Sequence, residues 1–379
     1  MKILHVIDNL NLGGTQNLAV RTWNDLIDRG HDVVACVLVE SNNEHKWTKL
    51  PQKLFRLGCH GDYRRPFAIG NWSKRLAKVI AQTKPDIIHS WLWLSDIVAA
   101  KAVAECGVRH VVHLVDRRNW QQSNRLRDRY RCWATRRAFA KANSSFLAVS
   151  QAAGQFAIDS LGISPTRVEV AYNSIYPNEF SSIPDSNTWK DTFQRLKLGI
   201  AARIEPEKGH IFLIEAMRLL RAKGVACHLK ITGDGTDRLL LERTVCEYQL
   251  SDSVEFVGWV EDVAAFLAGI DIFLVPSIDS EGLPTTILEA MSAGRLVVAT
   301  DVGGAVEAIV DQKTGVIVQP RDANSIADAI EKISANRDSA RLIAQNARLA
   351  VNEKFSMHKM IQTIESVYDK VVGEEFRSC

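Results

Sequence analysis

The chain has 379 residues, of which 46% are apolar and 24% charged, and its net charge is +3 at neutral pH. This length and apolar content suit two domains with full cores, whereas so small a net charge gives no support for nucleic-acid binding. The seven cysteines are scattered without a Cys-x-x-Cys pair, which argues against a zinc site and for free thiols in a reducing compartment.

The chain begins with a short apolar run, 2–7, that ends at Asp8. The run suits a buried strand but is too short for a secretory signal peptide. No run of about eighteen apolar residues occurs, so we expect no membrane-spanning segment. These features predict a cytoplasmic protein.

The first half of the chain alternates strand and helix patterns, with a glycine loop after the first strand. Strands are predicted at 2–7, 32–39, 86–89, 110–115, 146–149 and 168–172. Helices are predicted up to Gly30 and near 70–83, 94–105, 122–142 and 151–161. Such alternation predicts a parallel sheet that helices cover on both faces.

One segment, 109–141, is strongly basic. It holds ten Lys/Arg and two acidic residues, so it carries +8 and the rest of the chain about −5. Aromatic residues are interleaved with its arginines: Trp120, Tyr130, Trp133 and Phe139. A basic aromatic helix can lie on an anionic membrane surface. Alternatively, it packs one stripe, containing Leu126, Tyr130 and Trp133, into the core. Both interpretations stay open.

A polar stretch, 180–188, is the best candidate for a linker between domains. Beyond it, strands are predicted at 196–201, 228–232, 254–257, 270–275, 296–299 and 315–318, and the last helices near 337–354 and 356–373. The sequence therefore predicts two doubly wound α/β units, 1–180 and 181–355, that face a cleft.

Glycines and charges gather where ligands bind in open α/β sheets, beyond the carboxyl ends of strands. Gly13 and Gly14 follow the first strand. Successive strands of the second unit are followed by Arg203, Lys208, Gly233, Gly258, Trp259 and Gly282. Arg203 and Lys208 can neutralise a diphosphate. Backbone groups near Gly258 and Trp259 can bond to a base, and the Gly13-Gly14 loop lets the backbone approach a phosphate closely.

The most informative stretch is Glu281-Gly-Leu-Pro-Thr-Thr-Ile-Leu-Glu289, which places two carboxylates astride the start of a helix. Pro284 suits the first turn of this helix, and Gly294 closes it. Free N–H groups there can hold a phosphate, while carboxylates accept hydrogen bonds from sugar hydroxyls. The pair predicts a nucleotide sugar, although either glutamate alone is explained as well by the helix dipole.

Several motifs, in this order, resemble those of the retaining GT-B glycosyltransferases of family 4. The resemblance spans nearly the whole chain and is strongest at about 196–320. It rests on Gly13-Gly14, Arg203, Glu207-Lys-Gly209, Gly233-Asp-Gly235, Phe256-Val-Gly258, Pro276-Ser277, Glu281 to Glu289 and Asp301-Val-Gly-Gly304.

This resemblance implies two Rossmann-like domains, with the terminal helix, 356–379, crossing back to the first. It implies that Glu289 holds the ribose of a nucleotide-sugar donor, that Glu281 lies beside the transferred sugar, and that Arg203 and Lys208 grip the diphosphate. The loop around the diphosphate would be Gly282, Leu283, Pro284 and Thr285. The acceptor would sit against the first domain, and no metal or other cofactor is expected.

The chain also departs from the family pattern. The family often has a histidine near the fourth strand of the first domain. Here either His113 is its counterpart, or Arg118 and Asn119 contact the sugar instead. Gly294-Arg-Leu replaces the usual Gly-x-Pro, and we expect this change to be benign.

The expected reaction moves a hexose from a nucleoside-diphosphate sugar, with UDP as the expected nucleotide, to an acceptor hydroxyl with retention of configuration. The expected setting is lipid-linked glycan, lipopolysaccharide, capsule or O-antigen assembly at the inner face of the cytoplasmic membrane. A nucleotide-sugar epimerase and a non-catalytic nucleotide-sugar-binding protein remain alternatives. A dehydrogenase is less well supported, because Leu-Gly-Gly-Thr is not Gly-x-Gly-x-x-Gly.

Overall fold

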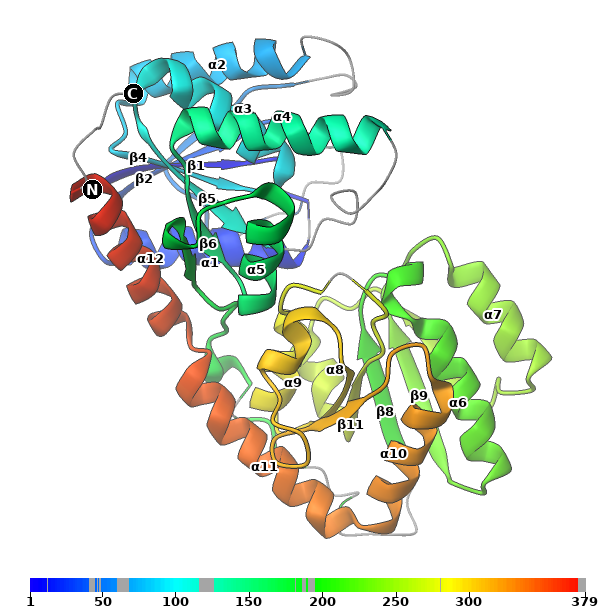
Figure 1. Ribbon diagram of the computed structural model, residues 1–379. Coiled ribbons are helices and arrows are strands. Elements are labelled where there is room, and N and C mark those ends of the chain that lie inside the picture. Colours follow the sequence, from blue (N-terminus) through cyan, green and yellow to red (C-terminus); the bar gives the residue numbers. More distant parts are fainter. Residues whose placement is uncertain are drawn as a thin grey trace. The chain divides into compact units, whose positions relative to one another are not determined.

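The structure is a computed structural model that describes residues 1–11, 13–40, 45, 47, 49–59, 68–115, 126–180, 182–185, 189, 195–279 and 281–373 (Figure 1). It divides into two compact units. One is Met1–Asn173 together with the chain from Met357, and the other is Ser174–Ser356. The chain thus enters the second unit after Asn173, before the polar stretch 180–188 that the sequence suggested as a linker.

The first unit is built on a seven-stranded sheet in the order β3-β2-β1-β4-β5-β6-β7, with every pair parallel. The central strands are buried along nearly their whole length, as a sheet covered on both faces requires. The strands are β1 (Lys2–Ile7), β2 (Asp32–Val37), β3 (Lys53–Arg56), β4 (Ile87–Trp91), β5 (Arg109–Leu114), β6 (Ser145–Ala148) and β7 (Val168–Val170).

Helices of the first unit include one from the far end of the chain. They are α1 (Gly14–Asp28), α2 (Ala68–Thr83), α3 (Trp93–Cys106), α4 (Leu126–Ala142), α5 (Gln151–Leu161) and the returning α12 (Met357–Gly373). Helix α12 packs on α1, and its buried residues Met360, Ile364 and Tyr368 recur at helical spacing. The Tyr368 hydroxyl lies 2.6 Å from His89 Nδ1 on β4, so α12 is part of this unit's core.

The second unit has a six-stranded sheet in the order β10-β9-β8-β11-β12-β13, also parallel throughout. The prediction of two doubly wound α/β units is therefore confirmed. Its strands are β8 (Leu196–Ala201), β9 (Cys227–Thr232), β10 (Val254–Gly258), β11 (Ile272–Val275), β12 (Leu296–Thr300) and β13 (Val316–Val318). Its helices are α6 (His210–Ala222), α7 (Arg238–Glu247), α8 (Val263–Ala268), α9 (Thr285–Ser292), α10 (Ala323–Ala335) and α11 (Arg337–Lys354), with the 3₁₀ turns η5 (Pro206–Lys208) and η6 (Gly303–Glu307).

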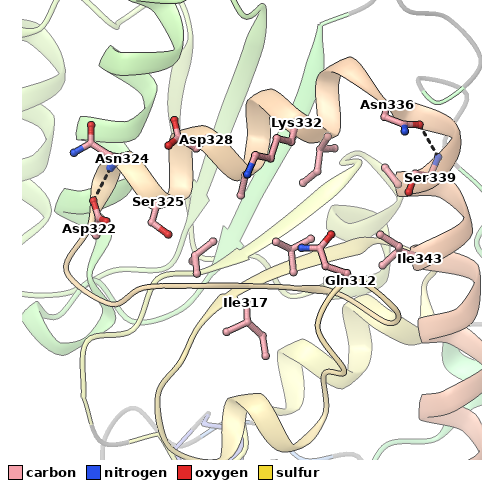
Figure 2. A pocket seen from close by; sticks show the side chains of 15 residues that line it. Gln312, Ile317, Asp322, Asn324, Ser325, Asp328, Lys332, Asn336, Ser339 and Ile343 are labelled. Atoms are coloured by element: carbon pink, nitrogen blue, oxygen red, sulfur yellow. Dashed lines mark hydrogen bonds between the residues drawn. The ribbon is translucent and has the colours of Figure 1, made fainter.

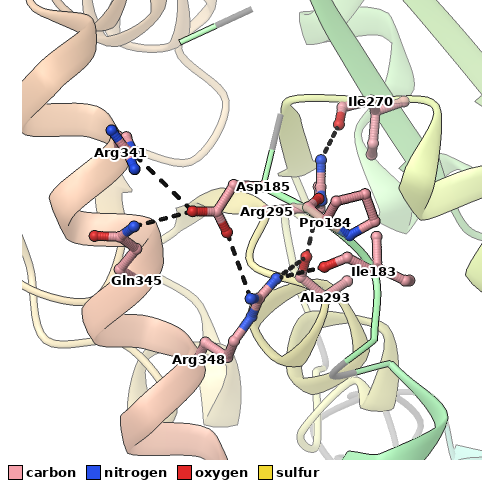
Figure 3. Close-up of polar contacts among 9 residues, drawn as sticks. All are labelled: Ile183, Pro184, Asp185, Ile270, Ala293, Arg295, Arg341, Gln345 and Arg348. Carbon is pink, nitrogen blue, oxygen red and sulfur yellow. Dashed lines mark hydrogen bonds and ion pairs between the residues drawn. The ribbon is translucent and has the colours of Figure 1, made fainter. Parts of the chain in front are cut away.

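Two arginines fasten the segment 183–185 to the rest of the second unit (Figure 3). The buried Arg295 side chain donates to three backbone carbonyls, one of them in this segment and one at Ala293, the C-cap of α9. Arg348 on α11 also donates to Ala293, at 2.9 Å, and lies 3.4 Å from the Asp185 carboxylate. Arg295, in the Gly294-Arg-Leu sequence that replaces the family's usual Gly-x-Pro, thus has a structural role.

Candidate functional site

The predicted donor-site residues of the second unit lie where its strands end. Arg203 follows β8, Gly233 follows β9, Gly258 ends β10, and Glu281 follows β11. Because all these strands are parallel, their carboxyl ends meet at one edge of the sheet, where ligands of such folds bind. Trp259, directly after β10, is exposed at this edge.

Close packing at this edge requires glycine at several positions, of which Gly209 and Gly233 are two. Gly209 has φ +69°, and a Cβ there would lie 2.1 Å from the Pro276 carbonyl oxygen. Gly233 has φ +126°, and its Cβ would lie 2.0 Å from the carbonyl oxygen of Ala202. The backbone N–H of Gly233 also donates to Gly258 O at 2.8 Å, so that carbonyl is engaged within the protein.

A partly buried ion pair joins two of the predicted site residues, Lys208 and Glu281. Lys208 Nζ, at the end of η5, donates to Glu281 Oε1 at 2.6 Å. The two side chains are only 21% and 8% exposed, and the hydroxyl of Ser277 donates to the same oxygen. A carboxylate and an ammonium can stay charged when buried because each compensates the other.

Arg203 lies differently from Lys208. Its side chain is 67% exposed and forms a 3.4 Å ion pair with Glu207 of η5. An exposed pair of this kind is weak, so the guanidinium can exchange Glu207 for a ligand phosphate at little cost. The structure thus places one predicted diphosphate contact in a fixed position and leaves the other adjustable.

The predicted phosphate loop, 282–285, leads into helix α9. It begins at Thr285, and Pro284 is the N-cap with φ −62° and ψ +123°, so the prediction that Pro284 lies inside the first turn is wrong. Proline fits here because its side chain needs no partner, but it offers no acceptor to the first-turn N–H groups. Leu283 is buried, and Glu289 lies half-buried just beyond the first turn.

In the first unit, Gly13 is the N-cap of α1 and Gly14 is its first residue. A Cβ at Gly14 would meet no atom within 4 Å, so the structure shows no packing reason for glycine there. The two alternative sugar contacts, Arg118 and Asn119, lie outside the described residues.

His113, the other candidate for sugar contact, is fully buried in the sheet. Its ring stacks on Trp91 with centroids 4.0 Å apart, and its Nδ1 lies 3.2 Å from His89 Nε2. Burial lowers the pKa of His113 to about 3, so the ring is neutral at physiological pH. This placement makes His113 part of the core of the first unit, and its contact with a sugar stays a prediction.

Helix α4 presents its aromatic residues to solvent. Tyr130 is 66% and Trp133 55% exposed, and their rings lie 5.8 Å apart. The guanidinium of Arg137 lies 5.7 Å from the Trp133 ring. The interpretation that Tyr130 and Trp133 pack into the core is therefore wrong. The buried face is instead formed by Thr135, Ala138, Phe139 and Ala142, with Asp128 at its start.

Two residues of the site were not singled out as contacts from the sequence: Ser277 and Thr300. Both hydroxyls are buried at the carboxyl ends of β11 and β12. Position gave a signal for both, since a small polar residue at the end of an apolar strand falls at the binding edge, and Ser277 also belongs to the Pro276-Ser277 motif.

Other features lie away from this site or supply no ligand set. A groove of about 500 Å³ on the second unit is lined by β13, α10 and the start of α11 (Figure 2), and no predicted site residue lines it. Within the part of the chain that the structure describes, no cluster of three or more His, Cys, Asp or Glu side chains suits a metal ion. No described helix is long and apolar enough to cross a bilayer.

The sequence as a whole matches two family models. One, described as glycosyl transferases group 1, matches residues 190–350, and the other, glycosyltransferase family 4, matches residues 12–179. The chain belongs to the group 1, family 4 glycosyltransferases. The family to which the motifs pointed is therefore confirmed, and each model matches one predicted domain, whereas retention of configuration stays a prediction.

Similar proteins include named glycosyltransferases and a solved structure with the same fold. The putative colanic acid biosynthesis glycosyltransferase WcaL of Salmonella typhimurium is 29% identical over 222 residues, 56% of this chain and 54% of the relative. An Escherichia coli UDP-Gal:alpha-D-GlcNAc-diphosphoundecaprenol alpha-1,3-galactosyltransferase is 22% identical over 311 residues, 79% of each chain. The crystal structure of Anabaena Alr3699/HepE in complex with UDP has a TM-score of 0.80 at 20% identity, covering 98% of this chain and 100% of that one. This chain spans about half the length of the first curated relatives it matches.

Proposed function

We propose that this protein transfers a hexose from UDP-hexose to a hydroxyl of a glycan or lipid-linked acceptor, with retention, during bacterial polysaccharide assembly. The observation that carries the proposal is the partly buried Lys208–Glu281 pair at the carboxyl edge of the second sheet. The names of the relatives, which include enzymes of colanic acid and lipid-linked glycan synthesis, support the acceptor class. UDP in the HepE structure supports the choice of nucleotide.

Lys208 can serve the leaving group while it stays paired. An ammonium has three N–H donors, and Glu281 takes one, so two remain for oxygens of the donor's diphosphate. The start of α9, where no side chain caps the helix, and the exposed Arg203 add positive potential at the same edge. These charges stabilise the diphosphate as the bond between the anomeric carbon and its oxygen breaks.

Glu281 is a poor candidate for a covalent nucleophile. Its Oε1 already accepts from Lys208 and from Ser277, and both contacts stabilise the carboxylate and reduce its nucleophilicity. We therefore favour attack by the acceptor oxygen on the face from which the diphosphate leaves, with the acceptor proton passing to a phosphate oxygen. No cofactor or metal takes part in this scheme.

The proposed donor is tested by thermal-shift measurements against UDP-, GDP-, ADP- and dTDP-sugars. A ligand that binds only the folded protein raises its stability, by about 2.7 kcal/mol when its concentration is 100 times Kd. UDP-sugars should give the largest shift. Incubation of the best donor without acceptor then separates the alternatives, because an isomerised sugar would indicate an epimerase.

Glu289→Ala is expected to weaken UDP binding about 10- to 100-fold. The half-buried carboxylate lies just beyond the first turn of α9, where it can accept both ribose hydroxyls, and charged hydrogen bonds contribute about 1.5–3 kcal/mol each. Titration calorimetry with UDP measures the change. Glu215→Ala, an exposed glutamate on α6, is the control. Parent affinity in Glu289→Ala would contradict the assigned ribose contact.

We also propose that the α4 surface binds anionic membranes, which would place the enzyme at the inner face of the cytoplasmic membrane. Reversing two exposed charges, Arg129→Glu with Arg137→Glu, should remove most vesicle binding, since each basic residue near such a surface contributes about 1 kcal/mol. Flotation with vesicles that contain phosphatidylglycerol is the measurement. The control reverses Arg195 and Arg243, exposed residues of the second unit. Absence of binding by the parent protein would exclude this membrane role.

A further inference from the structure

Glu281 is held by more than its ion pair. The hydroxyl of Ser277 donates to the same oxygen, Oε1, that Lys208 contacts, and Ser277 is almost completely buried. With both donors on one oxygen, the position of Oε1 is held by two contacts. Neither donor engages the other oxygen, Oε2, which can accept a hydrogen bond from a hydroxyl of the transferred sugar.

Ser277 is in turn held by Thr300, the last residue of β12. The buried Thr300 hydroxyl donates to the Ser277 carbonyl at 2.5 Å and also lies 3.3 Å from the carbonyl of Val275. Thr300 therefore fixes the turn that follows β11. Because the contact is to backbone, a shift of this turn would move the Ser277 hydroxyl away from Glu281.

The main chain of Glu281 is held by η6, the turn that follows β12. The N–H of Gly304, in η6, donates to the Glu281 carbonyl at 3.2 Å. Gly303 has φ +56°, and a Cβ there would lie 2.2 Å from that carbonyl oxygen. Side chain and main chain of Glu281 are thus both held by residues that follow β11 and β12.

The same turn is also tied to the segment that carries Lys208. The N–H of Ile278 donates to the Glu207 carbonyl at 2.9 Å, next to Lys208. A displacement of Ser277 is therefore transmitted to both members of the ion pair.

We propose that Ser277 and Thr300 are positioning residues for glycosyl transfer, acting through Glu281 and Lys208. This inference rests on the proposed function. Thr300 orients the turn, the Ser277 hydroxyl orients the carboxylate, and the carboxylate holds the ammonium that faces the diphosphate. Neither residue touches substrate. Their contribution is to turnover, because a misplacement of about 1 Å at a reacting group can cost about 100-fold in rate.

The test measures release of UDP from UDP-glucose and UDP-galactose by the full-length chain. Ser277→Ala and Thr300→Val should lower kcat about 10- to 100-fold, with KM and the Kd for UDP unchanged within about threefold. Thr300→Ser, which keeps the hydroxyl, should restore turnover. Thr244→Val is the matched control, since it removes a buried hydroxyl that bonds the Leu240 carbonyl on α7, away from the site.

Double variants distinguish positioning from general damage to the fold. Placed in a Glu281→Gln background, Ser277→Ala should cause little further loss, because residues that act through one another are not additive. Independent, multiplied losses, or parent kcat in both single variants, would overturn the inference alone. A Glu281→Gln variant with parent kcat, or a parent that releases UDP from neither sugar, would overturn the proposed function and the inference with it.

Discussion

Lys208→Ala is expected to lower kcat for donor turnover by about 10²–10³-fold, the cost of removing one preorganised donor from a developing negative charge. The loss has two parts. The diphosphate loses a cation, and Glu281, buried to 8% side-chain exposure, loses its 2.6 Å partner. Nucleotide release from UDP-sugars, followed under saturating donor, measures it.

Lys223→Ala provides the control for Lys208→Ala. Lys223 is a more exposed lysine of the same unit and pairs with Asp328 and Glu331. Its loss removes an exposed salt-bridge network without touching the strand ends, so turnover should stay at the parent value. Lys208→Ala with kcat within about threefold of the parent would show that the ammonium does not stabilise the leaving group.

Acidification from pH 7.5 to 5.5 is expected to destabilise the protein by about 5 kcal/mol. Burial lowers the pKa of His5, His110 and His113 to about 3 and that of His210 to about 4. The ordinary value in an unfolded chain is about 6.5. The unfolded state therefore binds more protons, so stability is fully present above pH 6.5 and is lost as the pH falls towards the folded values. At pH 5.5 each group costs about 1.4 kcal/mol.

The two units should differ in this response. Three of these four histidines, His5, His110 and His113, belong to the first unit, and His210 belongs to the second. At pH 5.5 the first unit should therefore unfold at a lower urea concentration than the second. The pKa of His89, also in the first unit, is lowered well below its usual value by burial, which enlarges the difference. Urea unfolding at both pH values, followed by hydrogen exchange in each unit, measures the effect. A total loss below about 2 kcal/mol would show that these rings take up protons without unfolding.

Much of the fold was predictable because buried parallel strands are short apolar runs. The bounds of β1 and β8 match the predicted runs residue for residue. β3 was missed, since its four residues, Lys53–Arg56, lie at the sheet edge with both charged ends exposed and show no apolar run. Edge strands need pairing on one side only, so their sequences carry a weaker signal.

Side-chain partners were less predictable than elements. The sequence placed Lys208 and Glu281 at one sheet edge, but their direct contact joins residues far apart in sequence and depends on how the η5 and β11 turns pack. For α4 the sequence left open whether Tyr130 and Trp133 face the core or the surface, and the helix instead buries the face with Thr135, Ala138 and Phe139. For His113, chain position could not show that strand β5 turns the ring into the core.

The return of α12 to the first unit determines which fragments of this chain can fold alone. Residues 174–356 are continuous and contain the six described strands of their own sheet, so we expect this piece to fold as an independent module. A fragment that ends at residue 173 would leave His89 without Tyr368 and would expose to water the apolar surface, including part of α1, on which α12 packs. An autonomous version of the first unit therefore requires a short artificial connection from residue 173 to residue 357.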